Sequence, residues 1–181
     1  METRFLSGKE EKARFDVYIL GIDPGMDGAI VALDHNGQCI GSVLTKKSLT
    51  VSVGKGSRRE YVPSFMADAL SIWGPLSTIK LVVLEKQQAM PKQGVASMFR
   101  TGVGYGLWLG ILAAKGLPTT IVRPVEWTKT VLKGVSGTGK DRAIVAASAR
   151  VPDLDLTPGK KRVPHSGLAD AACLALYGIN K

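Results

Sequence analysis

Apolar residues near the start of the chain fall into three short segments that are separated by polar turn residues. Residues 17–22 are continuously apolar, which is typical of a buried central strand. Residues 28–33 and 38–44 have the apolar content of two further strands, and the pair Asn36-Gly37 between them is typical of a tight hairpin turn. The pattern therefore predicts that the first three strands pair antiparallel.

The remainder of the chain alternates helical spacing with short apolar segments. Before the first helix lies a polar stretch, residues 46–59, in which the weak alternation of Val51 and Val53 is compatible with a flexible hairpin. Three strands followed by alternating helices and strands indicate an α/β fold, in which helices flank a mixed five-stranded sheet. We expect helices over residues 62–73, 96–115, 127–133, 141–150 and 166–177, and further strands over residues 81–84 and 119–122.

The length of the chain, 181 residues, fits one globular domain. Hydrophobic residues make up 45% of it, which is sufficient for a packed core and argues against global disorder. Residues 1–15 are mostly polar and charged. We therefore expect a flexible leader over residues 1–15 and a single domain over residues 16–181.

The chain is strongly basic, with 24 Lys and Arg residues against 15 Asp and Glu residues and a formal net charge of +9. This excess favours an acidic partner such as nucleic acid, although it also serves solubility. The two cysteines, Cys39 and Cys173, are too few for a disulfide framework and wrongly spaced for a zinc site, so we expect two small buried residues. Without a bilayer-length apolar stretch or a secretory signal, we expect no membrane contact and a soluble, intracellular protein.

Three carboxylates stand where apolar segments reach the edge of the predicted core. Asp23 follows the first strand, Glu85 follows residues 81–84, and Asp170 shares a face of the last helix with apolar residues. If the three acids converge, their mutual repulsion requires cations between them. Oxygen ligands of this kind suit Mg²⁺ or Mn²⁺ rather than zinc, and two such ions would activate a water and stabilise the leaving oxygen of a phosphodiester.

The alternative is that each acid has a local partner. Asp23 would then cap the turn that follows it, Glu85 would pair with Lys86 or Arg100, and Asp170 would pair with a distant basic residue. For each acid alone this alternative has equal weight. The position of all three at the ends of apolar elements favours a functional site.

His165 is a fourth candidate for the same site. It lies just before the last helix, for which Ser166 is a suitable N-cap. Its spacing of five residues from Asp170 allows the two to meet only if His165 lies in the preceding loop. The alternative is a solvent-exposed loop histidine, which is also our interpretation of His35.

One glycine-rich segment, residues 134–140, has the G-x-x-x-x-G-K spacing of a phosphate-binding loop. However, Asp141 stands where a Ser or Thr would hold Mg²⁺, and a predicted helix rather than a strand precedes the segment. We therefore expect no ATP binding. A flexible loop whose Lys140 and Arg142 contact a backbone phosphate is the better interpretation.

Three segments in this order resemble the RuvC-type Holliday-junction resolvases of the RNase H-like superfamily, and their phage and chloroplast members most closely. The segments are residues 21–25 (GIDPG), 81–85 (LVVLE) and 165–172 (HSGLADAA), which together span nearly the whole predicted domain. The resemblance implies an RNase H-like fold and a Mg²⁺-dependent homodimer, with Mn²⁺ as a substitute, that resolves four-way DNA junctions by two symmetric nicks. It further implies that the catalytic, metal-binding residues are Asp23, Glu85, His165 and Asp170.

One position departs from the bacterial members of that family, which have an acid or a histidine three residues before the last aspartate. Gly167 occupies that place here, and the wider spacing of His165 is closer to the chloroplast and some phage members. The resemblance also suggests a protein of a bacterium or a bacteriophage that acts in the cytoplasm.

DNA contacts are expected from basic and amide side chains around the predicted site. For any single residue a solvated surface charge is the alternative, but their clustering favours a binding surface. Gln87 and Gln88 directly follow Glu85 and are candidates for contacts with base edges. The complete predicted set is Lys46, Lys47, Lys55, Arg58, Arg59, Lys86, Gln87, Gln88, Lys92, Lys140, Arg142, Lys160, Lys161 and Arg162.

The helix that begins at residue 96 is similar to the dimer helix of the family, although ordinary packing against the sheet is an alternative. Two other functions remain open: an RNase H-like nuclease for other branched DNA or RNA–DNA hybrids, and a non-catalytic junction-binding protein. A phosphotransferase of the actin-like type requires more than one domain, and the length argues against it. The glycines that would permit close helix approach are Gly102, Gly104, Gly106 and Gly110.

Overall fold

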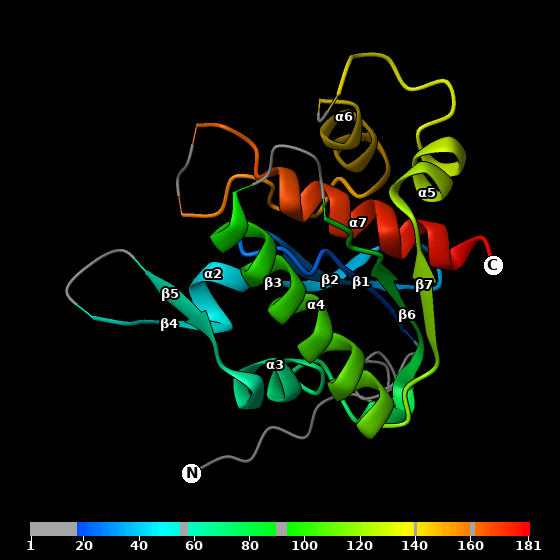
Figure 1. The fold of residues 1–181 in the computed structure, drawn as a ribbon. Helices are drawn as coiled ribbons and strands as arrows, with labels where there is room; N and C mark the ends of the chain where they lie inside the picture. The colour runs from blue at the N-terminus through cyan, green and yellow to red at the C-terminus, as the bar shows by residue number, and fades with distance from the viewer. Residues whose placement is uncertain (1–17, 55–57, 90–93, 140, 160–161) are drawn as a thin grey trace, which may run out of the picture.

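The structure is a computed structural model that describes residues 18–54, 58–89, 94–139, 141–159 and 162–181. Its centre is a five-stranded sheet with the strand order β3-β2-β1-β6-β7 (Figure 1). The leader predicted over residues 1–15 lies outside the described residues. Within the described part of the chain, no helix combines the length and hydrophobicity that crossing a membrane requires.

The first three strands of the sheet are consecutive and antiparallel, as the hydrophobic pattern predicts. β1 (Tyr18–Ile22) pairs with β2 (Ala29–Asp34), which pairs with β3 (Cys39–Leu44). On its other side β1 runs parallel to β6 (Ile79–Glu85), which runs parallel to β7 (Thr119–Val122). The predicted mixed five-stranded sheet is therefore confirmed.

Helices cover both faces of this sheet (Figure 1). One face carries α7 (Ser166–Ile179), with α5 (Pro124–Val131) and α6 (Asp141–Arg150) beside it. The other face carries α3 (Pro63–Ala69) and α4 (Val95–Ala114). The result is a three-layer arrangement in which both faces of the central strands are covered.

Two hydrophobic cores lie on the two faces of the sheet, because successive side chains of a strand point to opposite sides. Ile19 belongs to the core under α7, and its neighbour Leu20 belongs to the core that contains Trp108 of α4. Cys173 is buried in the first core, as predicted. Cys39 is only half-buried, so the prediction that it is a core residue is wrong, because it begins the edge strand β3.

The polar stretch between β3 and α3 forms a small hairpin beside the main sheet. After the short helix α2 (Thr45–Ser48), the strands β4 (Thr50–Ser52) and β5 (Arg59–Tyr61) pair antiparallel. This pairing agrees with the weak alternation of apolar residues seen in the sequence. A 3-10 turn, η1 (Leu76–Thr78), leads into β6.

The helices that differ most from the predicted boundaries are α3 and α5. α3 ends at Ala69 rather than at residue 73, because the amides of Leu70 and Ser71 donate to carbonyls three positions back and the chain continues in tighter turns. α5 begins at Pro124, not at residue 127. Proline is favoured in the first turn of a helix, and the Glu126 carboxylate accepts a 3.0 Å hydrogen bond from the Arg123 amide just before it.

Helix α7 packs directly against the backbone of β1. A Cβ atom at Gly21 of β1 would collide with the Ala171 carbonyl oxygen and lie 2.5 Å from the Ala175 amide nitrogen. Small residues on both elements therefore let the helix backbone rest directly on the central strand. This contact determines the height and direction of α7 above the sheet.

Gly21→Ala is expected to lower the free energy of unfolding by about 2 kcal/mol or more, because the added methyl group meets backbone atoms that no side-chain rotation can move. Urea denaturation followed by circular dichroism measures the change. Gly94→Ala is the matched control, since no atom lies within 4 Å of the added Cβ and alanine readily adopts the φ of −63° at this N-cap of α4, so stability should change by less than about 1 kcal/mol. Equal stability of Gly21→Ala and the unmodified chain would contradict the packing described for α7.

Candidate active site

Asp23 and Glu85 lie at one edge of the sheet, at the carboxyl ends of two neighbouring parallel strands. Ile22 pairs with Leu84 in the register of β1 and β6, so Asp23 and Glu85, the residues that follow them, lie at the same level of the sheet. Both acidic side chains are half-buried. The register therefore brings two carboxylates to the kind of sheet edge where α/β proteins commonly bind ligands.

Asp170 lies in the early turns of α7, between two close backbone contacts with the β1–β2 region. Gly167, the second residue of α7, packs against the backbone of Asp27. Ala171, the residue after Asp170, packs against Gly21. Asp170 itself is half-buried. The packing of α7 thus holds a third acid against the segment that contains the end of β1.

The turn after β1 fixes the direction of Asp23. Its Oδ1 accepts a 3.0 Å hydrogen bond from the Gly25 amide, so the predicted role of Asp23 as a turn cap is confirmed. Gly28 packs against the same residue, and a Cβ atom there would lie 2.8 Å from the Asp23 Cγ. The Asp23 side chain therefore both caps the turn and lies at the end of the strand.

Glu85 is held by two neutral donors. The Trp127 indole nitrogen donates to Oε1 over 2.8 Å, and the Gln87 amide donates to Oε2 over 2.9 Å. Within the described residues no ion pair involves Glu85, so the alternative that it pairs with Lys86 or Arg100 is wrong. Burial raises the pKa of Glu85, and the two hydrogen bonds oppose that rise.

His165 is the N-cap of α7. Its Nδ1 accepts a hydrogen bond from the Leu168 amide over 3.3 Å, so the prediction that Ser166 caps this helix is wrong and Ser166 is instead its first residue. His165 is half-buried rather than fully exposed and lines a cavity of about 430 Å³ together with Asp27 and Lys46. His35, in contrast, is exposed beside the turn after β2.

The four residues that the sequence singles out for metal binding are three carboxylates and one imidazole, a set of donors whose chemistry suits Mg²⁺ or Mn²⁺. In the part of the chain that the structure describes, no group of three or more His, Cys, Asp and Glu side chains is placed to hold a metal ion. The residue types fit a divalent cation, but their side chains are not gathered around one point. Simultaneous binding by Asp23, Glu85 and Asp170 requires their side chains to turn from these positions.

The basic residues of the β4–β5 hairpin region are held by partners within the chain. Lys46 pairs with Asp27 over 3.5 Å, and Arg58 pairs with Glu60 over 2.7 Å. Arg59 donates through its guanidinium to the Thr50 and Ser52 hydroxyls and to the Thr50 carbonyl. These pairs are exposed or half-exposed, so they are weak enough to exchange for another anion.

Other predicted DNA contacts are spread more widely. Arg142 donates to the carbonyls of Val135 and Leu132, which gives it a role in shaping the loop between α5 and α6. Lys86, Gln87 and Gln88 line a cavity of about 470 Å³ next to Glu85. Lys47 and Arg162 are exposed, and the remaining predicted contacts, Lys55, Lys92, Lys140, Lys160 and Lys161, lie outside the described residues.

The glycines of α4 have two different environments. A Cβ atom at Gly104 would lie 2.6 Å from the Tyr61 hydroxyl, so this glycine is needed for packing within the chain. Gly102, Gly106 and Gly110 have no atom within 4 Å of that position. Only these three present an open, small-residue face for close approach by another helix.

Four residues around the site were not singled out for these roles by the sequence. Trp127 contacts Glu85 from a position 42 residues away, and Tyr61 donates to the Pro24 carbonyl over 3.3 Å from a position 37 residues away. Asp27 and Arg100 line a cavity beside the same turn. No local pattern signals such contacts, since they arise from packing between separate elements.

No family model matches the sequence, and no curated protein matches it. Among solved structures, the chain is similar to Thermus thermophilus RuvC in complex with a Holliday junction substrate, with a TM-score of 0.56 and 13% sequence identity over 88% of this chain and 91% of that one. A second Thermus thermophilus RuvC structure matches with a TM-score of 0.50 and 17% identity over 88% of this chain and 92% of that one. The chain therefore has a RuvC-like fold, and the predicted RNase H-like fold class is confirmed.

Glu85→Gln is expected to increase stability at neutral pH when divalent cations are absent. Because burial raises the pKa of Glu85 in the folded state, the unmodified chain loses stability as the pH rises from the ordinary value of 4.5 through that raised pKa. The variant lacks this loss and retains an acceptor oxygen for Trp127, while its new NH2 group donates to the Gln87 carbonyl once that side-chain amide has flipped. In EDTA, its free energy of unfolding should exceed that of the unmodified chain at pH 7, and the difference should vanish under more acidic conditions.

Chemical denaturation at several pH values measures this effect. Glu60→Gln is the control, since it removes a carboxylate of an exposed ion pair and should change stability by less than about 1 kcal/mol. A Glu85→Gln variant that is less stable than the unmodified chain at pH 7 would show that burial does not raise the pKa of Glu85.

Proposed function

We propose that this protein is a structure-selective DNA endonuclease that resolves four-way junctions by paired symmetric nicks. The observation that carries the proposal is the position of Asp23 and Glu85 at the carboxyl ends of adjacent parallel strands, in a chain with a RuvC-like fold. The basic charge of the chain suits a polyanionic substrate. The proposal includes a cytoplasmic location in a bacterium or a phage-infected cell.

In the proposed site, Asp23, Glu85 and Asp170 hold Mg²⁺, for which Mn²⁺ substitutes. When bound, the metal supplies an activated water and stabilisation of the leaving 3′-oxygen. The chain's own contribution is orientation. The turn at Gly25 directs Asp23, and the Trp127 indole and Gln87 amide direct the two oxygens of Glu85.

His165 supports the reaction in this proposal as a hydrogen-bond donor that positions a reactant. Because Nδ1 accepts the Leu168 amide proton, the neutral imidazole carries its own proton on Nε2. A ring in that tautomer offers a hydrogen bond to a phosphate oxygen or to the attacking water. This arrangement favours positioning over abstraction of a proton at Nε2.

Paired nicks require two active sites related by two-fold symmetry, which a homodimer supplies. Helix α4 supports that part of the proposal through its exposed apolar residues, among which Val95 is 79% and Phe99 is 72% exposed. The open glycines Gly102, Gly106 and Gly110 lie on the same side of the helix by their spacing. A second copy that packs along this face would bury both sets.

Asp23→Asn is expected to abolish nicking while junction affinity stays equal or increases, because the substitution removes a negative charge near the substrate. The assay combines a labelled synthetic four-way junction and a matched linear duplex, each with and without Mg²⁺. Asp68→Asn is the control, since Asp68 is exposed on α3 and away from the sheet edge. It should cleave like the unmodified chain.

Each of three outcomes identifies a different function. Paired Mg²⁺-dependent nicks on the junction, lost only in Asp23→Asn, would establish a junction resolvase. Cleavage of an RNA–DNA hybrid or another branched DNA in preference to the junction would assign a different nuclease of the same fold. Junction binding without any nicking would replace the enzyme by a non-catalytic binding protein.

A further inference from the structure

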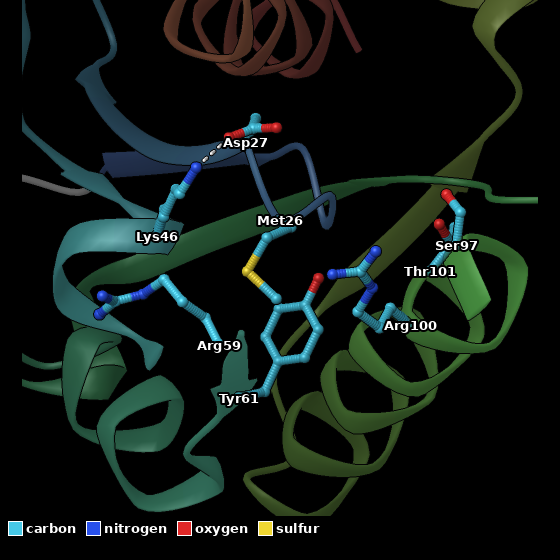
Figure 2. A pocket seen from close by; sticks show the side chains of 8 residues that line it. All are labelled: Met26, Asp27, Lys46, Arg59, Tyr61, Ser97, Arg100 and Thr101. Carbon is cyan, nitrogen blue, oxygen red and sulfur yellow. Dashed lines mark ion pairs between the residues drawn. The ribbon is translucent and has the colours of Figure 1, made fainter. Parts of the chain in front are cut away.

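A cavity of about 220 Å³ lies beside the turn that follows Asp23. Figure 2 shows the eight side chains that line it, which come from the β1–β2 turn, from α2, from β5 and from the first turns of α4. Met26 and Asp27 form the wall on the side of the turn. The cavity therefore connects the candidate active site with the basic hairpin and with α4.

The charge around this cavity is mainly positive. Three cationic side chains, those of Lys46, Arg59 and Arg100, line it, and Asp27 is the single carboxylate among the lining residues. Lys46 is paired with Asp27, and the guanidinium of Arg59 points away from Tyr61 and is held by the hairpin. Among the residues that line the cavity, cationic side chains therefore outnumber carboxylates by three to one.

Arg100 is the cation best placed to bind a ligand there. Its guanidinium and the Tyr61 hydroxyl point toward one another across the cavity (Figure 2). Within the described residues no ion pair involves Arg100. A guanidinium carries several donors in a planar fork, a geometry that matches two oxygens of a phosphate group.

Tyr61 fixes the wall between Arg100 and the active-site turn. Its ring fills the space over Gly104 of α4, and its hydroxyl donates to the carbonyl of Pro24, the residue after Asp23. Burial and the negative charge of Asp23 raise the pKa of Tyr61 to about 12, while the charge of Arg100 opposes that rise. The hydroxyl is therefore protonated at neutral pH and lies within electrostatic range of both Asp23 and Arg100.

A second cavity, of about 430 Å³, adjoins the first. The two share Asp27, Lys46 and Arg59, and the second extends to Lys47 and to the loop that ends at His165. Cationic side chains thus follow one another from α4 to the N-terminus of α7. Such a series fits an extended polyanion rather than a single small anion.

We propose that the cavity between α4 and the Asp23 turn binds a backbone phosphodiester of the nucleic-acid strand that enters the active site, with Arg100 as its principal ligand. This inference rests on the proposed function, because it assumes a nucleic-acid substrate at the acidic edge. Lys46 contributes by exchanging its exposed partner Asp27 for the phosphate. The contact positions the strand in register and carries no base specificity.

The test compares Arg100→Gln with Arg150→Gln in EDTA, so that binding is measured without cleavage. Arg150 is exposed at the end of α6, on the opposite face of the sheet, and its substitution changes the net charge equally (Figure 1). Fluorescence anisotropy with a labelled four-way junction should show roughly tenfold weaker binding for Arg100→Gln. Its plot of log affinity against log salt should be shallower by about one, while Arg150→Gln changes neither quantity measurably.

A second arm locates the phosphate. Single methylphosphonate substitutions along the junction strands remove one phosphate charge at a time, and one position near the branch point should weaken binding of the unmodified chain. The same substitution should have no further effect on Arg100→Gln, because the contact is already lost. Circular dichroism and thermal melting verify that the variant, whose substituted side chain is exposed, stays folded.

Two results would overturn the inference: equal affinities for Arg100→Gln and Arg150→Gln, or additive effects of Arg100→Gln with every methylphosphonate. These results are distinct from failure of the proposed function. A chain that binds through Arg100 but never nicks would reject the nuclease and keep the phosphate site. A chain that resolves junctions while Arg100→Gln binds normally would reject only the phosphate site.

Discussion

Helix α7 and strand β1 approach so closely that only a hydrogen atom fits between their backbones at Gly21. This contact depends on small residues on the inner face of the helix, among them Ala171 and Ala175, and it removes the space that a larger side chain would occupy. This contact fixes the position of α7 on the central sheet. Because Asp170 directly precedes Ala171, the seat of the helix on β1 also decides where that acid stands relative to the end of the strand.

The acids at the edge of the sheet are half-buried, although charged groups are more stable in water. Glu85 ends a strand whose three preceding residues are fully buried, and within the described residues its hydrogen bonds come from Trp127 and Gln87 rather than from a cation. Neutral donors orient a carboxylate without cancelling its charge. Such an arrangement keeps the charge available for a ligand, which is a common property of functional sites.

The hairpin β4–β5 lies outside the main sheet and connects α4 with the turn after β1. Its residue Tyr61 packs over Gly104 of α4 and reaches the turn after β1, so an element peripheral to the sheet is fastened to the centre of the site. The same hairpin places Arg59 in the wall of the cavity that Met26 and Asp27 of the β1–β2 turn also line. In the proposed function, the acidic strand ends hold cations and the basic residues beside them attract a polyanion.

The amino-acid sequence by itself determined the antiparallel start of the sheet, the alternation of helices and strands, and the ends of β1 and β6 at Asp23 and Glu85. These features are local, because apolar runs, turn pairs and strand-terminal acids act over a few neighbouring positions. Tertiary structure alone decided that Trp127 reaches Glu85, that Tyr61 lies over Gly104, and that α3 ends early. Such contacts join positions tens of residues apart, and their geometry depends on how whole elements pack, which no local pattern encodes.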